Sequence, residues 1–229
     1  MFMRVWVLVA FVLACTAVQA DESELKTEKQ RFSYAIGVQI GGSMQRDGLD
    51  VDGSIIGQAI SDVLSKSSLR LSAEQMQAAF TSFQNKKAQE MQALAEVNMK
   101  KGKDFLDKHR KEKGVKELGN GIQYKVLTAG KGDKPSETDT VVVNYRGTLV
   151  DGTEFDSSYK RGEPATFAVN AVIQGWQEIL PMMPVGSKWE VVIPSDLAYG
   201  PRGTGGGVIG PNDTLVFEIE LKEIKKAAD

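Results

Sequence analysis

The distribution of proline divides this chain of 229 residues into two parts. Residues 24–113 contain no proline, whereas all seven prolines and most of the 23 glycines fall from Gly114 onward. Because proline lacks a backbone N–H and clashes with the preceding helical turn, a stretch of this length without it favours continuous helices. We therefore expect a helical first half and a β-rich second half.

The first half repeats apolar residues at helical spacing in three segments. Two short helices are expected over residues 25–46 and 55–64, separated by the turn pairs Asp47-Gly48 and Asp52-Gly53. A third pattern begins at Ser72, where Gln75 completes a capping box, and continues to a stop at Gly114. At 1.5 Å per residue, this third helix would be roughly 63 Å long.

The two ends of this long helix differ in composition. Its apolar stripe fades after Met99, and the residues that follow are mostly basic with acidic residues among them. Such interleaved charge indicates a solvated helix face and not a membrane or nucleic-acid patch. We therefore expect the first half of the helix to pack and the second half to stand in water. The apolar stripe of the first half consists of Met76, Phe80, Phe83, Met91 and Leu94.

His109, the only histidine of the chain, lies among the charges of the second half and is expected at the surface.

The first twenty residues read as an export signal. Arg4 precedes the apolar run 5–13, and residues 18–20 (VQA) form a small-residue cleavage site. The only cysteine, Cys15, lies inside this signal, so a mature chain from Asp21 would have no disulfide and no thiol nucleophile. A lipoprotein signal that ends at Cys15 is the alternative interpretation. The 28 basic and 30 acidic residues give a net charge of −2, which does not indicate a nucleic-acid partner.

Beyond Gly114 the period changes to two. Apolar residues at 141, 143 and 145 alternate with residues 142, 144 and 146, and the same alternation occurs over residues 214–221. These patterns predict strands with one buried face, antiparallel by preference. One short helix, expected over residues 173–180, could pack across that face.

Several kinds of catalytic site are excluded by the residues present. The only histidine, His109, lies among charges on the long helix, so a Ser-His-Asp triad and histidine-rich zinc sites are not available. Residues 205–210 match the pattern G-x-G-x-x-G, but Pro211 and a strand follow where a phosphate-binding loop needs a helix. We expect a loop there, and neither a cofactor nor a metal. The second half also contains a concentration of aromatic residues, which suits either an ordinary β core or a concave apolar site: Tyr145, Phe155, Phe167, Trp176, Tyr199 and Phe217.

Six segments of the second half resemble the FKBP family in the family's order and spacing. They are 141–149 (VVVNYRGTL), 151–158 (DGTEFDSS), 172–176 (VIQGW), 183–186 (MPVG), 198–200 (AYG) and 211–217 (PNDTLVF). The first half, with Ser33–Gly37 (SYAIG) and its long helix, resembles the Mip subgroup of exported bacterial FKBPs. In that subgroup a small helical domain dimerises and the long helix holds the catalytic domain away.

This resemblance implies an α+β fold. An all-helical N-terminal domain and a long connecting helix would precede a bent antiparallel sheet wrapped around one short helix. The expected divisions are a signal peptide over 1–20, a dimerisation domain over 21–71, the connecting helix over 72–113 and the isomerase domain over 114–229. The location would be the periplasm, or the cell surface or outer membrane, of a bacterium.

The resemblance also implies a function. The chain would be a peptidyl-prolyl cis/trans isomerase that assists the folding of exported proteins. Asp156 and Tyr199 would be the polar, catalytic groups, and the apolar residues of the substrate pocket would be Tyr145, Phe155, Phe167, Val172, Ile173, Trp176 and Phe217. The implied partners are proline-containing polypeptides, a second copy of the chain bound through the N-terminal helices, and macrolides of the FK506 or rapamycin type as inhibitors.

The sequence departs from the family in two places. Ala165 stands where many relatives carry an aromatic residue, so we expect one pocket wall to be thinner, and the glycine-rich loop 201–210 is about one residue longer than in the smallest relatives. Two other functions stay open. They are a dimeric folding chaperone and a surface interaction protein, each with secondary isomerase activity.

Overall fold

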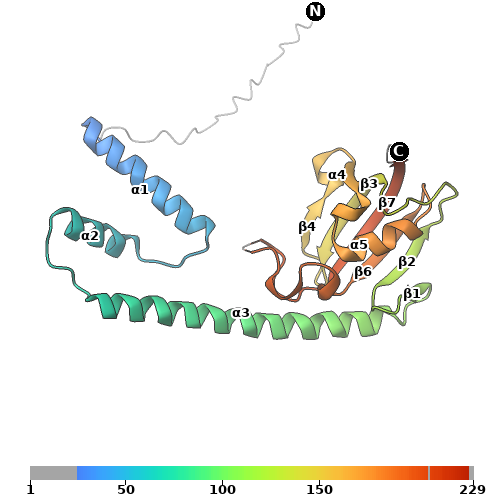
Figure 1. The fold of residues 1–229 in the computed structure, drawn as a ribbon, viewed down its shortest axis with the longest axis horizontal. Coiled ribbons are helices and arrows are strands. Elements are labelled where there is room, and N and C mark those ends of the chain that lie inside the picture. Colours follow the sequence, from blue (N-terminus) through green and yellow to red (C-terminus); the bar gives the residue numbers. More distant parts are fainter. Residues whose placement is uncertain (1–24, 206, 227–229) are drawn as a thin grey trace, which may run out of the picture. The chain divides into compact units, whose positions relative to one another are not determined.

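The computed structural model describes residues 25–205 and 207–226 (Figure 1). The predicted export signal, with Cys15, lies outside the described residues. In the described ranges, no helix is long and apolar enough to cross a membrane. The chain divides into two units, one that ends at Gly57 and one that begins at Gln58.

The first unit is dominated by helix α1, Glu28–Arg46. Thr27 caps it, because its hydroxyl accepts the N–H of Gln30 while the Gln30 side chain accepts the N–H of Thr27. No residue of α1 is buried. Helix α2, Gly53–Leu64, begins in this unit and continues into the second. Both helices confirm the predicted segments.

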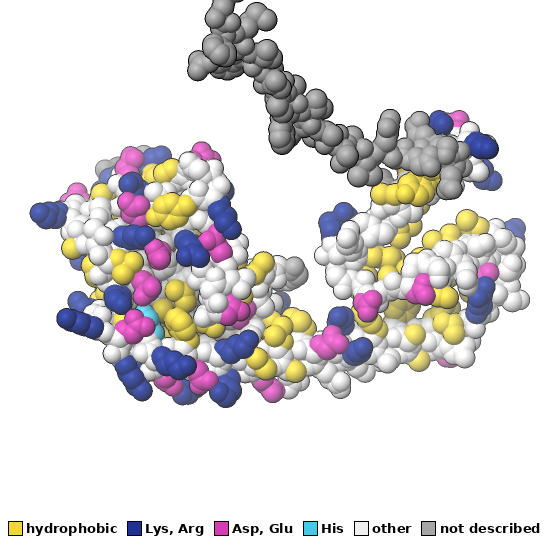
Figure 2. All heavy atoms as spheres, turned by 180° about the vertical axis from the view of Figure 1, so that it is seen from behind, with side chains coloured by type: hydrophobic (Ala, Val, Ile, Leu, Met, Phe, Trp, Pro, Cys, Tyr) yellow, Lys and Arg dark blue, Asp and Glu magenta, His cyan; other side chains and the backbone are white. Residues whose placement is uncertain are grey.

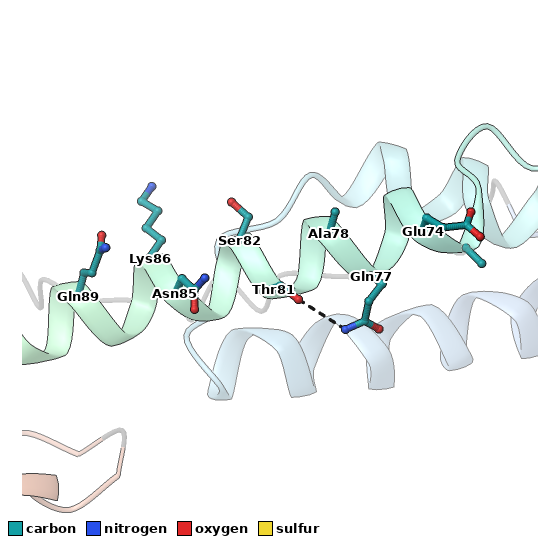
Figure 3. Close-up of a pocket in the computed structure, with 9 residues that line it drawn as sticks. Glu74, Gln77, Ala78, Thr81, Ser82, Asn85, Lys86 and Gln89 are labelled. Atoms are coloured by element: carbon teal, nitrogen blue, oxygen red, sulfur yellow. Dashed lines mark hydrogen bonds between the residues drawn. The ribbon is translucent and has the colours of Figure 1, made fainter.

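Helix α3, Ala73–His109, begins where the sequence predicts it. The capping box between Ser72 and Gln75 is present, with the Gln75 N–H donating to the Ser72 hydroxyl at 3.2 Å. The helix ends four residues before the predicted limit of 113. Side chains along one face of its first half are mostly polar, from Glu74 to Gln89 (Figure 3).

The second half of the chain forms one antiparallel sheet, as predicted. Its strands run in the order β1-β2-β6-β7-β3-β4, and β5 pairs with β3 beside β4. Alternation explains the packing, because Val141, Val143 and Tyr145 of β3 are buried while the residues between and after them are half-buried or exposed. The bounds are Val115–Glu117 (β1), Gln123–Thr128 (β2), Thr140–Leu149 (β3), Glu154–Ser157 (β4), Ala165–Ala168 (β5), Lys188–Ile193 (β6) and Leu215–Lys225 (β7).

Helix α5, Gln174–Ile179, lies across the buried face of this sheet (Figure 1) and confirms the predicted helix over 173–180. Gly175 lets it come close, because a Cβ there would lie 2.5 Å from Cγ2 of Ile193 on β6. Trp176 and Ile179 point into the core between helix and sheet. Helix α4, Ser158–Arg161, is a single turn after β4, and 3₁₀ turns occupy Val169–Ala171, Leu180–Met182, Ser195–Leu197 and Gly200–Arg202.

The second half of α3 packs against the sheet domain, so the expectation that it stands in water is wrong. Asn98, Gly102 and His109 are buried on that side of the helix. His109 is only 3 % exposed, with Nδ1 2.8 Å from Oε1 of Gln123 and Nε2 3.2 Å from Oε1 of Glu190. The predicted surface position of His109 is therefore also wrong. Helical periodicity does not reveal contacts with residues far away in the sequence.

The opposite face of this half is solvated, as the interleaved charges indicate. Nζ of Lys100 lies 2.7 Å from Oδ2 of Asp104, four residues further along the helix. Lys103 and Asp107 form the same kind of ion pair, also at 2.7 Å. Figure 2 shows Lys and Arg side chains mixed with Asp and Glu side chains over the sheet domain. On the side of the molecule that Figure 2 shows, the described residues form no large area of positive or negative charge alone.

Candidate functional site

One pocket of the sheet domain gathers residues from six different parts of the chain. It encloses about 460 Å³ and is lined by Tyr145, Phe155, Asp156, Phe167, Ala171, Val172, Ile173, Trp176, Tyr199 and Phe217. A larger hollow, of about 1060 Å³, lies along α3. Residues of that one helix alone line it (Figure 3), so it lacks the converging walls of a binding site.

The fold explains why these side chains meet. Tyr145 and Phe217 lie on the neighbouring strands β3 and β7, with Phe155 on β4 and Phe167 on β5 beside them. Helix α5 crosses this surface and contributes Trp176 from its first turn. Val172 and Ile173 directly precede α5, and Tyr199 follows the 3₁₀ turn Ser195–Leu197.

Trp176 lies at the centre of an aromatic cluster. Its ring centroid is 5.3 Å from that of Tyr145, 5.8 Å from that of Phe167 and 5.3 Å from that of Phe217, all in edge-to-face geometry. Phe155 packs in the same way on Phe217, at 5.6 Å. Such pairs are stabilising beyond the burial of each ring, so the aromatic side chains that form the walls also hold one another in place.

Asp156 is the carboxylate of this pocket, and its hydrogen bonds fix both oxygens. Oδ2 accepts the hydroxyl of Tyr145, and Oδ1 accepts the Arg161 guanidinium and the N–H of Ser157, the latter at 2.8 Å. Arg161 also donates to the Tyr145 hydroxyl at 2.9 Å. Ser158 holds the strand in place, because its hydroxyl accepts the N–H of Tyr145 at 2.9 Å.

These contacts decide the charge of Asp156. Burial acts to raise its pKa, but the hydrogen bonds from Tyr145 and Arg161 outweigh burial and hold the pKa below its ordinary value. The carboxylate is therefore ionised at neutral pH. It can act as a fixed negative charge and an acceptor, but it has no proton to give.

Tyr199 is the second polar group, and it is 42 % exposed. Burial of its phenol, followed by the negative charge of Asp156, raises its pKa. It is thus a neutral O–H donor at physiological pH. Among the described residues, its hydroxyl has no hydrogen-bond partner, and so it is available to a bound molecule.

All nine residues named from the sequence line this pocket. Ala171 lines it as well, and the sequence reasoning missed it although it directly precedes Val172. Arg161 was also missed. The only signal for it was a basic residue five positions after Asp156. Ala165 packs against the core without lining the pocket.

Comparison with known proteins identifies the architecture. Residues 131–222 match the model of the family described as FKBP-type peptidyl-prolyl cis-trans isomerase, and residues 29–126 match that of the domain amino-terminal to it. The chain is 43 % identical over 225 residues to the outer membrane protein MIP of Legionella longbeachae, covering 96 % of each. This chain belongs to the FKBP-type peptidyl-prolyl cis-trans isomerases. It is also 41 % identical over 222 residues to the peptidyl-prolyl cis-trans isomerase Mip of Coxiella burnetii, with 95 % of each covered.

A solved FKBP structure shares the two-part arrangement. The crystal structure of FkpA from Escherichia coli is 40 % identical in sequence and superposes with a TM-score of 0.63. The match covers 89 % of this chain and all of that one. The FKBP fold expected from the sequence, with a helical part before the sheet domain, is therefore confirmed.

Proposed function

We propose that the aromatic pocket around Trp176 is the prolyl isomerase site of this FKBP. The observation that carries the proposal is an ionised carboxylate and an unpaired phenol, Asp156 and Tyr199, at the edge of an otherwise apolar pocket. FKBP proteins bind proline-containing peptides and macrolides of the FK506 or rapamycin type. A pocket of about 460 Å³ has room for a proline ring and parts of its neighbours.

The reaction needs neither a nucleophile nor a metal. Rotation about the X-Pro bond is opposed by amide resonance, with a barrier of about 18–20 kcal/mol, and no covalent bond is broken. In the twisted transition state, resonance is lost and the carbonyl carries less negative charge. A dry aromatic pocket favours this less polar species over the planar, hydrated ground state.

Asp156 and Tyr199 have separate roles in this mechanism. Asp156 provides a fixed negative charge and an acceptor beside the twisting bond, without moving a proton to the substrate. Tyr199 donates its hydroxyl to a substrate carbonyl, and the N–H of Ile173, which precedes α5, offers a second donor. Val172 and Ile173 form an apolar rim that favours an apolar residue before proline.

Two substitutions test this assignment. Asp156→Asn keeps the shape but removes the charge, so kcat/KM for an X-Pro peptide should fall about 10- to 100-fold. Tyr199→Phe removes one hydrogen bond and should lower kcat/KM about three- to tenfold. The control is Tyr159→Phe, on α4 and outside the pocket, which should retain full activity. Wild-type kcat/KM in both pocket variants would reject the assignment.

The helical half supports a further part of the proposal, a homodimer. Apolar side chains of α1 are exposed in the single chain, with Phe32 at 67 % and Val38 at 57 %. A Cβ on Gly37 or Gly41 would meet nothing within 4 Å, which leaves room for a second helix to approach. We propose that residues 21–71 pair with a second copy and that residues 114–229 carry the catalytic pocket. Export to the periplasm or outer membrane, through a signal over residues 1–20, is part of the same proposal.

A further inference from the structure

Helix α3 contacts the segment between Tyr199 and strand β7, two elements that contribute side chains to the pocket. Asn98 is 8 % exposed, and its Nδ2 donates to the carbonyl oxygen of Pro211 at 3.0 Å. Its neighbour along the same face, Leu94, lies near Gly210, because a Cβ on Gly210 would be 3.1 Å from Asn98 Nδ2 and 3.7 Å from Leu94 Cδ2. A buried side-chain amide that bonds a loop carbonyl 113 residues away fixes the loop relative to the helix.

One turn further along, Gly102 meets the same segment. A Cβ built on Gly102 would lie 2.2 Å from Oγ1 of Thr214 and 3.0 Å from its Cβ. Thr214 is itself only 5 % exposed. Leu94, Asn98 and Gly102 are four residues apart, and therefore share one face of the helix. Glycine here allows the backbone of α3 to lie directly against the start of β7.

The contacted segment connects two walls of the pocket. Tyr199 precedes it at one end, and Phe217 follows three residues after Thr214 at the other. The segment is closed on itself, since the N–H of Asn212 donates to the carbonyl of Gly200 at 2.9 Å. Asn212 also has a left-handed backbone, with φ of 56°. This hydrogen bond connects the residues between Pro211 and Thr214 to Gly200, the neighbour of Tyr199.

We propose that α3 is a structural part of the catalytic unit, in which Asn98 and Gly102 are positioning residues for the Tyr199 side of the pocket. The proposal rests on the assignment of the pocket as the isomerase site. It implies that the helix does more than connect two domains. The placement of Tyr199 depends on α3, although no residue of α3 lines the pocket.

The first test uses two asparagines of the same helix in the full protein. Asn98→Ala removes the bond to Pro211, and we expect kcat/KM for an X-Pro peptide to fall about tenfold, mainly through KM. Amide exchange at Asn212 should become about tenfold faster in the same variant. Asn85→Ala is the matched control, because Asn85 lies on the exposed polar face (Figure 3), and should stay within about twofold of wild type.

The second test separates docking from helix stability. Alanine is a better helix former than glycine, so Gly102→Ala should strengthen α3 if the residue matters only locally. If docking matters, the added methyl collides with Thr214, and kcat/KM should fall about tenfold. Gly57→Ala on α2, where a Cβ meets nothing within 4 Å, is the control and should leave kcat/KM unchanged.

The outcomes distinguish the two proposals. If Asn98→Ala and Gly102→Ala lower only the melting temperature, and leave kcat/KM and Asn212 exchange at the control values, then the contact is merely structural and this inference fails. If Asp156→Asn and Tyr199→Phe are also fully active, the assignment of the pocket itself fails. Loss of kcat/KM and faster exchange in the α3 variants, with active controls, supports the positioning role.

Discussion

At the residue scale, neighbouring groups determine the charge state of the two polar residues of the site. Asp156 is held ionised by Tyr145 and Arg161 against the effect of burial, and burial keeps Tyr199 protonated. Neither group needs to change its protonation state during isomerisation. Acid–base catalysis would require at least one group with a pKa near the working pH, and these two are shifted away from it.

The pH dependence of catalysis follows from these directions. The pKa of Asp156 is below its ordinary 3.8 and that of Tyr199 is above its ordinary 10.0. Between about pH 5 and pH 9, both groups therefore keep their charge state, and kcat/KM for an X-Pro peptide should be flat. A pH profile measured at one ionic strength checks this. A bell shape centred within that range would show that a titrating group takes part.

Arg161 offers a second test at this scale. Arg161→Ala removes donors to both Asp156 and Tyr145, so the carboxylate should lose its fixed orientation and kcat/KM should fall about three- to tenfold. The loss of stability should be small, because the Arg161 side chain is 44 % exposed and its ion pair is screened by water. Lys160→Ala, its neighbour on α4, pairs with Glu154 instead and serves as the control. Equal activity in both variants would contradict the role of Arg161.

At the element scale, the end of α3 is held on the sheet by a buried imidazole. Gln123 fixes the geometry, because its amide donates to the carbonyl of Leu106 at 3.1 Å and to Glu117 at 3.0 Å, which leaves Oε1 toward His109. His109 Nδ1 must then donate, and Nε2 faces the Glu190 carboxylate. A proton on Nε2 completes an ion pair there. Glu112, which bonds Lys125, is the other carboxylate close to the ring.

This junction should respond to pH in a defined direction. The hydrogen bond to Glu190 raises the pKa of His109 above 6.5 despite burial, and His109 lowers that of Glu190 below 4.5. The contribution of His109 is thus complete below about pH 6.5 and is lost as pH rises through its folded pKa, while that of Glu190 is lost in acid. Relative to His109→Gln, the free energy of unfolding should therefore decrease from about pH 6 to pH 9. Chemical denaturation at several pH values checks this, and a constant difference would contradict the ion pair.

Most of the helices and strands were predictable from the sequence, because their signals are residues that lie close together in the chain. The proline-free stretch, the Ser72 capping box and the alternation around Tyr145 each involve residues close in sequence, and the corresponding helices and strands are present. The pocket residues came from family motifs and not from periodicity. What the sequence did not reveal depends on distant partners: the burial of His109 against Glu190, the bond from Asn98 to Pro211, and the contact of Arg161 with Asp156.

At the scale of the whole molecule, the proposal is a dimer with two catalytic arms. Exposed apolar residues on α1 and α2 are the surface that a second copy would cover, including Ile55 at 56 % and Val63 at 62 %. A helical segment of this size buries little apolar surface by itself, and dimerisation is a common way to bury more of it.

We expect dimerisation to raise activity on unfolded proteins and to leave activity on short peptides unchanged. Residues 90–229 retain the contacts of α3 with Pro211 and Thr214, so this fragment should keep full activity on a short peptide. It should lose activity on an unfolded protein, which two arms engage at a raised effective concentration. The full chain from Asp21 should sediment as a dimer at micromolar concentration, and the fragment as a monomer. A full-length monomer, or equal losses on both substrates, would contradict the division of labour.

The most direct test of the central claim is titration of the protein from Asp21 with a rapamycin-type macrolide. Trp189→Phe leaves Trp176 as the reporter, because Trp189 stacks on Tyr124 outside the pocket. Peptide isomerisation and Trp176 fluorescence should change together and saturate at one macrolide per chain. Undiminished kcat/KM at macrolide concentrations that saturate the Trp176 signal would show that isomerisation occurs elsewhere.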